Sequence, residues 1–245
     1  MPLTQLPILK RLIPSLRKRI SRHSSWPGGN GVVRRNGALF LVNMRNAFDR
    51  VLVTHGGFEQ EQITYFLNNI RDRGCDVFLD IGANVGAYSI FVAQQTSCKT
   101  IIAFEPDSRS FIRLRANALL NGLVEVIDAR QVAVTDKNGS VPFAYGPDDY
   151  DVVSKVSDEP QPQSVPAIRL DDAVSFTGRR IAMKIDIEGH ERVALGGMRK
   201  LLQNNQCFMQ VECFEPNFLA FKSDIEAIGY KYVHQFGYDR YFSNA

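Results

Sequence analysis

The sequence predicts an α/β fold class, in which a mostly parallel sheet is covered by helices, from three observations. Beyond residue 76, short apolar runs alternate with segments of helical periodicity, as expected of strand–helix units. The first apolar run, residues 77–80, passes through a turn with two glycines into a helix, an arrangement that presents backbone N–H groups to a ligand. The last two runs, 230–235 and 239–242, are close enough in sequence to form a hairpin.

Each remaining element follows from a local pattern. The first expected helix, residues 58–73, has one apolar face, acids in its first turn and a glycine after its last. The other expected helices are residues 87–95, 108–120, about 191–203 and 217–228. The other expected strands are residues 100–104, 124–127 or 131–134, 181–186 and 207–212. Five strand–helix units capped by an antiparallel C-terminal hairpin are typical of the Rossmann-like, seven-stranded class I methyltransferase sheet.

Three other segments lie outside these units. Residues 1–31 are expected as a basic N-terminal segment and linker ahead of a methyltransferase domain at 32–245, which begins with one or two strands and a hairpin turn at Asn36-Gly37. Residues 3–23 have amphipathic helical spacing and can lie on an anionic membrane surface; the alternatives are docking on the protein's own domain or a disordered arm. Residues 140–165 are expected as an acidic insertion loop that either covers the substrate or is a plain mobile loop.

Charge and cysteine spacing limit the functional classes. All 26 acidic residues follow residue 48, against 20 of the 29 Lys and Arg, so the domain is net negative and we expect no nucleic-acid partner. The four cysteines lack C-x-x-C spacing, which indicates reduced thiols. No apolar stretch approaches the roughly 18 residues of a membrane span, and no signal-peptide run is present. A cytoplasmic location is expected, with residues 3–23 as the candidate segment for peripheral contact with the inner membrane face.

A first group of candidate residues surrounds the turn after the first strand. Gly82 and Gly86 form G-x-x-x-G rather than the G-x-G-x-x-G of a dinucleotide site, which disfavours a nicotinamide enzyme. Gly82 permits close approach to a ligand, and Asp80 can hold the turn or an amino group of the ligand. Glu105 ends the next strand, where an acid accepts hydrogen bonds from ribose hydroxyls. These features predict a nucleoside cofactor without pyrophosphate, and S-adenosyl-L-methionine fits best.

A second group follows the strand at 181–186. Asp186 and His190 are the candidate catalytic residues, because a hydroxyl acceptor must lose a proton close to the transferred methyl group. His190 has an ordinary pKa near neutrality, although it could instead be a capping or core histidine. The leading expectation has no metal, and a Mg²⁺ site formed by Asp186 and Glu212 is the alternative. The strand lacks the terminal Asn/Asp-Pro-Pro-aromatic run of many amine-methylating enzymes, which favours a hydroxyl acceptor.

Taken together, these motifs resemble the FkbM family of S-adenosylmethionine-dependent methyltransferases. The resemblance covers roughly residues 58–216 and rests on residues 78–86 (FLDIGANVG), 104–106 (FEP), Asn117, 170–172 (LDD) and 184–191 (KIDIEGHE). It implies O-methylation of sugars or natural products, and Asn84 is assigned to the cofactor site with the residues named above. The length and basic N-terminus look like the members that methylate sugar hydroxyls, including the fucose of rhizobial nodulation factors.

We therefore expect an S-adenosylmethionine-dependent O-methyltransferase that acts on a hydroxyl of a carbohydrate or glycolipid. The alternatives are an O-methyltransferase of a polyketide or other small natural product and, more remotely, a non-catalytic binding protein with the same fold. The expected partner is a small-molecule or oligosaccharide acceptor. Its identity, the methylated position and the oligomeric state are left open.

Overall fold

The computed structural model describes residues 29–46, 49–50, 53, 59–147 and 154–245. The chain divides into one unit of residues 1–58 and 147–150 and a second unit of residues 59–146 and 151–245, each described here by itself. The basic segment predicted at 3–23 lies outside the described residues, and the domain boundary predicted at residue 32 stays a prediction. Within the described ranges, no helix is long and apolar enough to span a membrane.

The first unit contains the predicted hairpin. Strands β1 (Asn30–Arg35) and β2 (Ala38–Asn43) pair antiparallel, with Arg35 opposite Ala38. Asn36 and Gly37 both have positive φ, at 47° and 89°, as the two central residues of a type I′ turn require. The Asn-Gly signal in the sequence therefore predicted this turn correctly.

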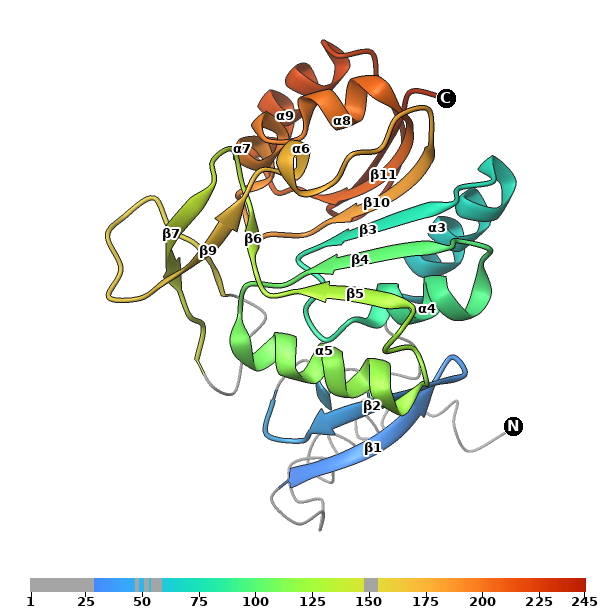
Figure 1. Ribbon diagram of the computed structural model, residues 1–245, viewed down its shortest axis with the longest axis vertical. Coiled ribbons are helices and arrows are strands. Elements are labelled where there is room, and N and C mark those ends of the chain that lie inside the picture. The colour runs from blue at the N-terminus through green and yellow to red at the C-terminus, as the bar shows by residue number, and fades with distance from the viewer. Residues whose placement is uncertain (1–28, 47–48, 51–52, 54–58, 148–153) are drawn as a thin grey trace, which may run out of the picture. The chain divides into compact units, whose positions relative to one another are not determined.

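The second unit is built on a seven-stranded sheet with the order β12-β13-β11-β10-β3-β4-β5 (Figure 1). Its strands are β3 (Val77–Ile81), β4 (Thr100–Phe104), β5 (Ile127–Arg130), β10 (Arg180–Ile185), β11 (Gln206–Glu212), β12 (Lys231–Phe236) and β13 (Asp239–Ser243). Only β13 runs antiparallel to its neighbours, and it forms the expected hairpin with β12. This order and the single reversed strand confirm the Rossmann-like class I methyltransferase sheet.

Helices connect the strands and cover the sheet. They are α3 (Gln60–Arg73), α4 (Ala87–Gln95), α5 (Ser108–Leu120), α6 (Leu170–Ala173), α7 (Glu191–Gly196), α8 (Arg199–Asn204) and α9 (Asn217–Glu226). Figure 1 shows α6, α7, α8 and α9 gathered on one side of β10 and β11, away from α3 and α4. Because parallel strands need crossover connections, their carboxyl ends meet at one edge, where the loops of the site converge.

The two faces of the sheet bury different side chains. Leu79 and Met183 belong to an aliphatic cluster that includes residues of α7, α8 and α9. Side chains alternate between faces along a strand, so Phe78 points the other way. There it packs 5.7 Å, centroid to centroid, from Phe66 of α3, which lies at the same distance from Phe208 of β11. The core holds both faces of the sheet in place behind the site.

Two elements differ from the sequence-based expectation. The prediction of a single helix at 191–203 is wrong, because the helix is interrupted between α7 and α8. At Gly197 a Cβ atom would lie 2.0 Å from the carbonyl oxygen of Thr135, so the backbones approach too closely for another residue. The third strand in chain order was expected at 124–127 or at 131–134. In the structure it is β5, which starts at Ile127, the last residue of the first of these two ranges.

The prediction of one continuous insertion loop at 140–165 is wrong at residues 140–144, 155–156 and 164–165, which belong to strands of a second sheet. Strands β7 (Gly139–Ala144), β8 (Lys155–Val156) and β9 (Ser164–Ile168) join β6 (Ala133–Val134) in the order β6-β9-β7-β8. Val141, Phe143 and Val165 bury a small core of their own. The alternating apolar residues of β7 and β9 predict strands, but the acids and prolines around them favoured a loop in the sequence-based prediction.

Candidate active site

The glycine turn between β3 and α4 lies directly against the segment after β10. Gly82 has φ of +79°, and a Cβ atom at this position would lie 1.8 Å from the carbonyl oxygen of Asp186. The Asp186 amide in turn donates to the Ile81 carbonyl, at 3.0 Å, and the Gly82 amide donates to the Phe104 carbonyl at the end of β4. The two groups of residues singled out in the sequence are therefore in contact.

Asp80 links the end of β3 to the first turn of α4. Its Oδ2 accepts hydrogen bonds from the amide and the hydroxyl of Ser89, at 3.1 and 2.6 Å. Its Oδ1 is buried and has no partner among the described residues. Burial raises the pKa of Asp80 above its ordinary value, although the nearby Lys184 charge opposes that shift. Asp80 thus holds the turn and keeps one oxygen unused.

Glu105 and Asn84 form the second part of the turn's polar lining. Glu105 Oε2 accepts from the Asn84 amide at 2.8 Å, and Oε1 accepts from the Asp107 amide at 2.7 Å. Burial raises the pKa of Glu105 to about 8, even though these two hydrogen bonds favour the carboxylate. Asn84 has φ of 49°, and its side-chain oxygen is buried without a partner among the described residues.

Gly86 lies at the other end of the turn, where it precedes α4. Its φ is +82°, and a Cβ atom there would lie 3.0 Å from the Leu114 side chain of α5. Asn117 of α5 donates to the Val85 carbonyl at 2.9 Å, which ties the turn to this helix. Helix α5 thus supports the turn from the side opposite β10.

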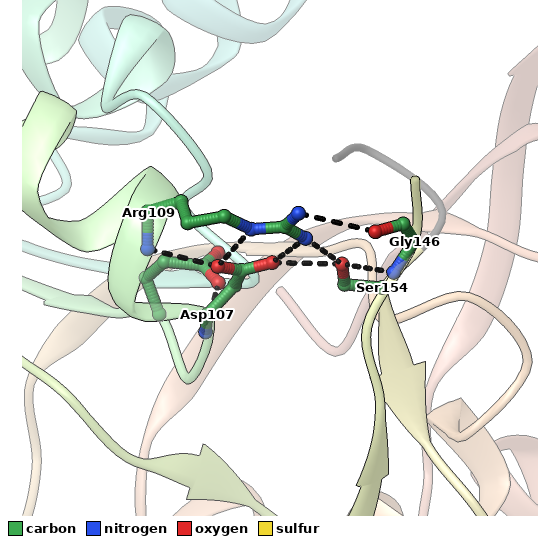
Figure 2. A network of polar contacts seen from close by, with 5 residues as sticks. Asp107, Arg109, Gly146 and Ser154 are labelled. Carbon is green, nitrogen blue, oxygen red and sulfur yellow. Dashed lines mark hydrogen bonds and ion pairs between the residues drawn. The ribbon is translucent and has the colours of Figure 1, made fainter. Parts of the chain in front are cut away.

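An ion-paired network follows Glu105 at the start of α5 (Figure 2). Asp107 caps the helix by accepting from the Arg109 amide at 2.8 Å, and the Arg109 guanidinium lies 2.7 Å from Asp107 Oδ2. The Ser154 hydroxyl donates to the same oxygen at 2.7 Å, and Arg109 donates to the Gly146 carbonyl at 3.1 Å. Despite burial, these donors lower the pKa of Asp107. The network joins the small sheet to the end of β4.

Lys184, Asp186 and Glu212 form a charged group at the ends of β10 and β11. Lys184 Nζ lies 2.7 Å from Asp186 Oδ2, and its side chain is only 7% exposed whereas that of Asp186 is 26% exposed. Burial disfavours the Lys184 cation, but the carboxylates of Asp186, Glu59 and Asp80 outweigh it and raise the pKa of Lys184. Burial, the Asp186 charge and a hydrogen bond with Asp186 raise the pKa of Glu212 well above its usual value.

A row of buried polar residues lies behind this group. Strand register places Lys184 opposite both Asp80 and Gln210. Gln210 donates to the Tyr88 hydroxyl at 2.9 Å, and the Tyr88 hydroxyl donates to Glu59 at 2.7 Å. The sequence reasoning missed these residues. Polar side chains inside apolar strand runs, Lys184 in 181–186 and Gln210 in 207–212, were the signal that could have revealed them.

His190 lies apart from this charged group. Its ring is buried, with Nε2 3.0 Å from the Thr135 hydroxyl at the end of β6. Burial lowers the pKa of His190, while Asp158 and Asp136 act in the opposite direction. Within the described ranges, no polar contact joins His190 to Asp186. The catalytic role predicted for His190 therefore stays a prediction, and the ring packs against the second sheet.

The structure also shows where the residues predicted to bind the cofactor or a metal lie. Gly82, Asn84 and Gly86 lie in the turn that follows Asp80, Glu105 bonds to that turn through the Asn84 amide, and Gly82 contacts Asp186. Among the residues that the structure describes, no three or more His, Cys, Asp or Glu side chains are grouped as a metal site. The Mg²⁺ alternative stays a prediction: its two carboxyl groups lie close enough for the Asp186 charge to raise the pKa of Glu212.

With this geometry in view, the chain was compared with known proteins. It matches the model described as the Methyltransferase FkbM domain over residues 80–239, which is more than half of its length. The chain belongs to the FkbM methyltransferase family. The matched region begins at Asp80 and ends at Asp239, and so includes every predicted site residue.

Two curated relatives are similar over part of the chain. The 31-O-demethyl-FK506 methyltransferase FkbM of Streptomyces tacrolimicus is 26% identical over 167 residues, which are 55% of this chain and 64% of that protein. The hexuronic acid methyltransferase AglP of Haloferax volcanii is 26% identical over 148 residues, 60% of this chain and 59% of that protein. The FkbM-family chain thus spans less than two thirds of the length of either relative.

Solved structures also align with the FkbM-family chain. The FkbM methyltransferase from Methylobacillus flagellatus has a TM-score of 0.47 and 17% identity, covering 69% of this chain and 43% of that one. The O-methyltransferase from Bacillus cereus in complex with SAH has a TM-score of 0.48 and 11% identity, covering 76% and 81%.

Proposed function

We propose that this FkbM-family protein is an S-adenosyl-L-methionine-dependent O-methyltransferase whose acceptor is a hydroxyl group of a carbohydrate or glycolipid. The observation that carries the proposal is the contact between the glycine turn and Asp186. It brings an accessible carboxylate next to the segment that would bind the cofactor, which is the arrangement a methyl transfer to a hydroxyl needs.

The residues of the turn fit the proposed cofactor. Two buried oxygens, Asp80 Oδ1 and Asn84 Oδ1, lack partners in the described chain and can accept hydrogen bonds from a polar ligand. Glu105 lies at the end of β4, where its oxygens have remaining acceptor capacity for the ribose hydroxyls. Gly82 and Gly86 allow the positive φ values of the turn, and the space of their missing Cβ atoms is occupied by the Asp186 carbonyl and the Leu114 side chain.

The residues around Asp186 can handle the acceptor proton. When bound, S-adenosylmethionine supplies an electrophilic methyl group on a sulfonium sulfur. Asp186 takes the proton that the acceptor hydroxyl loses as its oxygen forms the new bond to carbon. Lys184 holds the Asp186 carboxylate in position, at 2.7 Å, and Glu212 lies close to it on the neighbouring strand. His190 supports this segment from behind through Thr135.

The names of two relatives support two classes of acceptor. The relative AglP is named for hexuronic acid, which supports a sugar, whereas the relative FkbM is named for a demethylated FK506, which supports a polyketide acceptor as the second candidate. The same chemistry at Asp186 serves both. A net-negative domain favours neither nucleic acid nor another polyanion.

The first test is a calorimetric titration of the protein with S-adenosylmethionine and, separately, with NAD. Micromolar binding of S-adenosylmethionine alone supports the cofactor assignment, and binding of neither supports a non-catalytic protein. A radiolabelled methyl-incorporation assay then compares methyl glycosides of fucose, rhamnose, glucose and glucuronic acid with a macrolide alcohol. Incorporation into the macrolide alone would contradict the carbohydrate class.

Substitutions at Asp186 and His190 test the proton acceptor. Asp186→Asn should leave cofactor affinity nearly unchanged and lower turnover about a hundredfold or more, because the amide cannot take a proton. His190→Gln places an amide group where Nε2 contacts Thr135 and should retain most turnover, whereas His190→Ala should lower it without weakening cofactor binding. Loss of turnover in His190→Gln with normal turnover in Asp186→Asn would make His190 the base instead.

A further inference from the structure

Two exposed aromatic rings face one another beside the site. Phe214 and Tyr238 have ring centroids 4.6 Å apart with an interplanar angle of 46°. Phe214 is 39% exposed and Tyr238 is 54% exposed, unlike the fully buried rings of Phe208 and Tyr241 in the adjoining strands β11 and β13. Single exposed apolar residues are common on protein surfaces, but a contacting aromatic pair exposes a continuous apolar surface.

The backbone joins this pair to the carboxyl group next to Asp186. Phe214 follows Glu212 by two residues at the carboxyl end of β11, and Tyr238 directly precedes Asp239, the residue that pairs with Glu212 across β11 and β13. The Cys213 amide donates to the Tyr238 carbonyl at 3.1 Å, so the two segments are held together. Glu212 follows Val211, which pairs with Ile185 in the neighbouring strand, the residue before Asp186. The rings therefore lie at the same edge of the sheet as the proposed base.

A neighbouring arginine supports the position of the pair. The Arg240 guanidinium lies 4.2 Å from the centroid of Phe218, and its side chain is only 9% exposed. It also lies 3.9 Å from the Glu215 carboxylate, next to Phe214 in the chain. The Phe218 amide donates to the Phe214 carbonyl at 3.2 Å. These contacts fix the segment that carries Phe214 while the aromatic rings stay exposed.

We infer that Phe214 and Tyr238 form the acceptor subsite, on which the C–H face of a pyranose ring stacks while one of its hydroxyls reaches Asp186. This inference rests on the proposed function, whose substrate class it specifies. The face of an aromatic ring carries negative charge and attracts the slightly positive C–H groups of a sugar, while the Tyr238 hydroxyl can hydrogen-bond the sugar rim. The Glu215 carboxylate, 56% exposed, can accept further sugar hydroxyls.

The test compares Phe214→Ala and Tyr238→Ala with wild type in methyl transfer to the glycoside that incorporates most label. Each variant should raise the KM for that glycoside about threefold to tenfold, with kcat changed less than about twofold. Calorimetric affinity for S-adenosylmethionine should be unchanged in both. Tyr238→Phe keeps the ring and should raise KM less than Tyr238→Ala. Ile112→Ala removes an exposed apolar side chain from α5 and should have no effect.

Each other outcome has a defined meaning. Glycoside KM values within twofold of wild type in both alanine variants, or a lower kcat at unchanged KM, would overturn the stacking subsite and leave the proposed function standing. If wild type binds S-adenosylmethionine but methylates no glycoside, the carbohydrate class fails and the subsite fails with it. Because an alanine variant could fold poorly, Phe214→Trp provides a second measurement: the larger ring should lower the glycoside KM.

Discussion

Glycines in this chain differ in what a side chain would meet, which allows a matched test at the scale of single residues. Gly82 and Gly122 have similar φ values, +79° and +68°, but a Cβ atom would meet the Asp186 carbonyl at 1.8 Å in the first case and open space in the second. We expect Gly122→Ala to cost about 1–2 kcal/mol of unfolding free energy from backbone strain alone.

Gly82→Ala should cost at least about twice as much, because it adds a backbone clash to the same strain. Urea unfolding of both variants measures the difference. Equal losses of stability in the two variants would show that the turn can move away from Asp186 and that their contact is not tight.

A second prediction at the residue scale concerns Glu105. Glu105→Ala should weaken S-adenosylmethionine binding about tenfold or more, since hydrogen bonds to the ribose hydroxyls are lost and two backbone amides lose their partner. Calorimetry measures the change, with Glu125→Ala, in the exposed loop after α5, as the control. Equal affinity in wild type and Glu105→Ala would refute the ribose assignment.

At the scale of elements, Arg109 connects α5 to the small sheet. Its guanidinium contacts Asp107, the Gly146 carbonyl and Ser154, so Arg109→Ala should release the ends of β7 and β8 from the helix. Because the Gly146 amide is bonded to the Ser154 hydroxyl, its hydrogen exchange should accelerate about tenfold. Arg115→Ala on the same helix is the control. Unchanged exchange at Gly146 would mean that Asp107 alone holds Ser154.

A further prediction concerns the buried ion pair at the central strand β10. Lys184→Met leaves the carboxylates of Asp186 and Asp80 without their counter-ion, and we expect a loss of about 3–5 kcal/mol of unfolding free energy. The double variant Lys184→Met/Asp186→Asn removes one of the stranded charges and should be more stable than the single variant. A strictly additive cycle in urea unfolding would show that the two side chains do not interact.

At the scale of the whole molecule, buried carboxyl groups set the pH dependence of the ligand-free protein. Burial raises the pKa of Glu105 from an ordinary 4.5 to about 8, and that of Glu188 to about 7. Between about pH 4.5 and pH 8, the folded state keeps protons on these two groups that the unfolded state has released. The contribution of the two groups to the free energy of unfolding is therefore complete below about pH 4.5 and decreases as pH rises toward 8. His190, with a lowered pKa, contributes the opposite slope near its ordinary pKa.

Thermal unfolding from pH 5 to pH 8 measures this balance. Glu105→Gln cannot ionise, so its Tm should fall less steeply with pH than that of wild type, and the two curves should differ most near pH 8. Parallel curves would show that Glu105 does not hold a proton in the folded protein.

The sequence by itself determined what depends on neighbours along the chain. Alternation and helical spacing identified the strands of the seven-stranded sheet and most helices, Asn36-Gly37 identified a turn, and the acid at the end of each strand identified Asp80 and Glu105. These signals work because strand and helix periods extend over only a few residues. Where backbone segments distant in sequence approach each other, as Gly197 does to Thr135, the predicted helix was wrong.

Only the tertiary structure decided which side chains share a site. Strand order and register set Lys184 opposite both Asp80 and Gln210, and they brought Glu212 close to Asp186. They also turned His190 toward Thr135, although it is close to Asp186 in sequence. The physical reason is that pairing between strands separated by a hundred residues depends on the packing of the entire core, which no local pattern encodes.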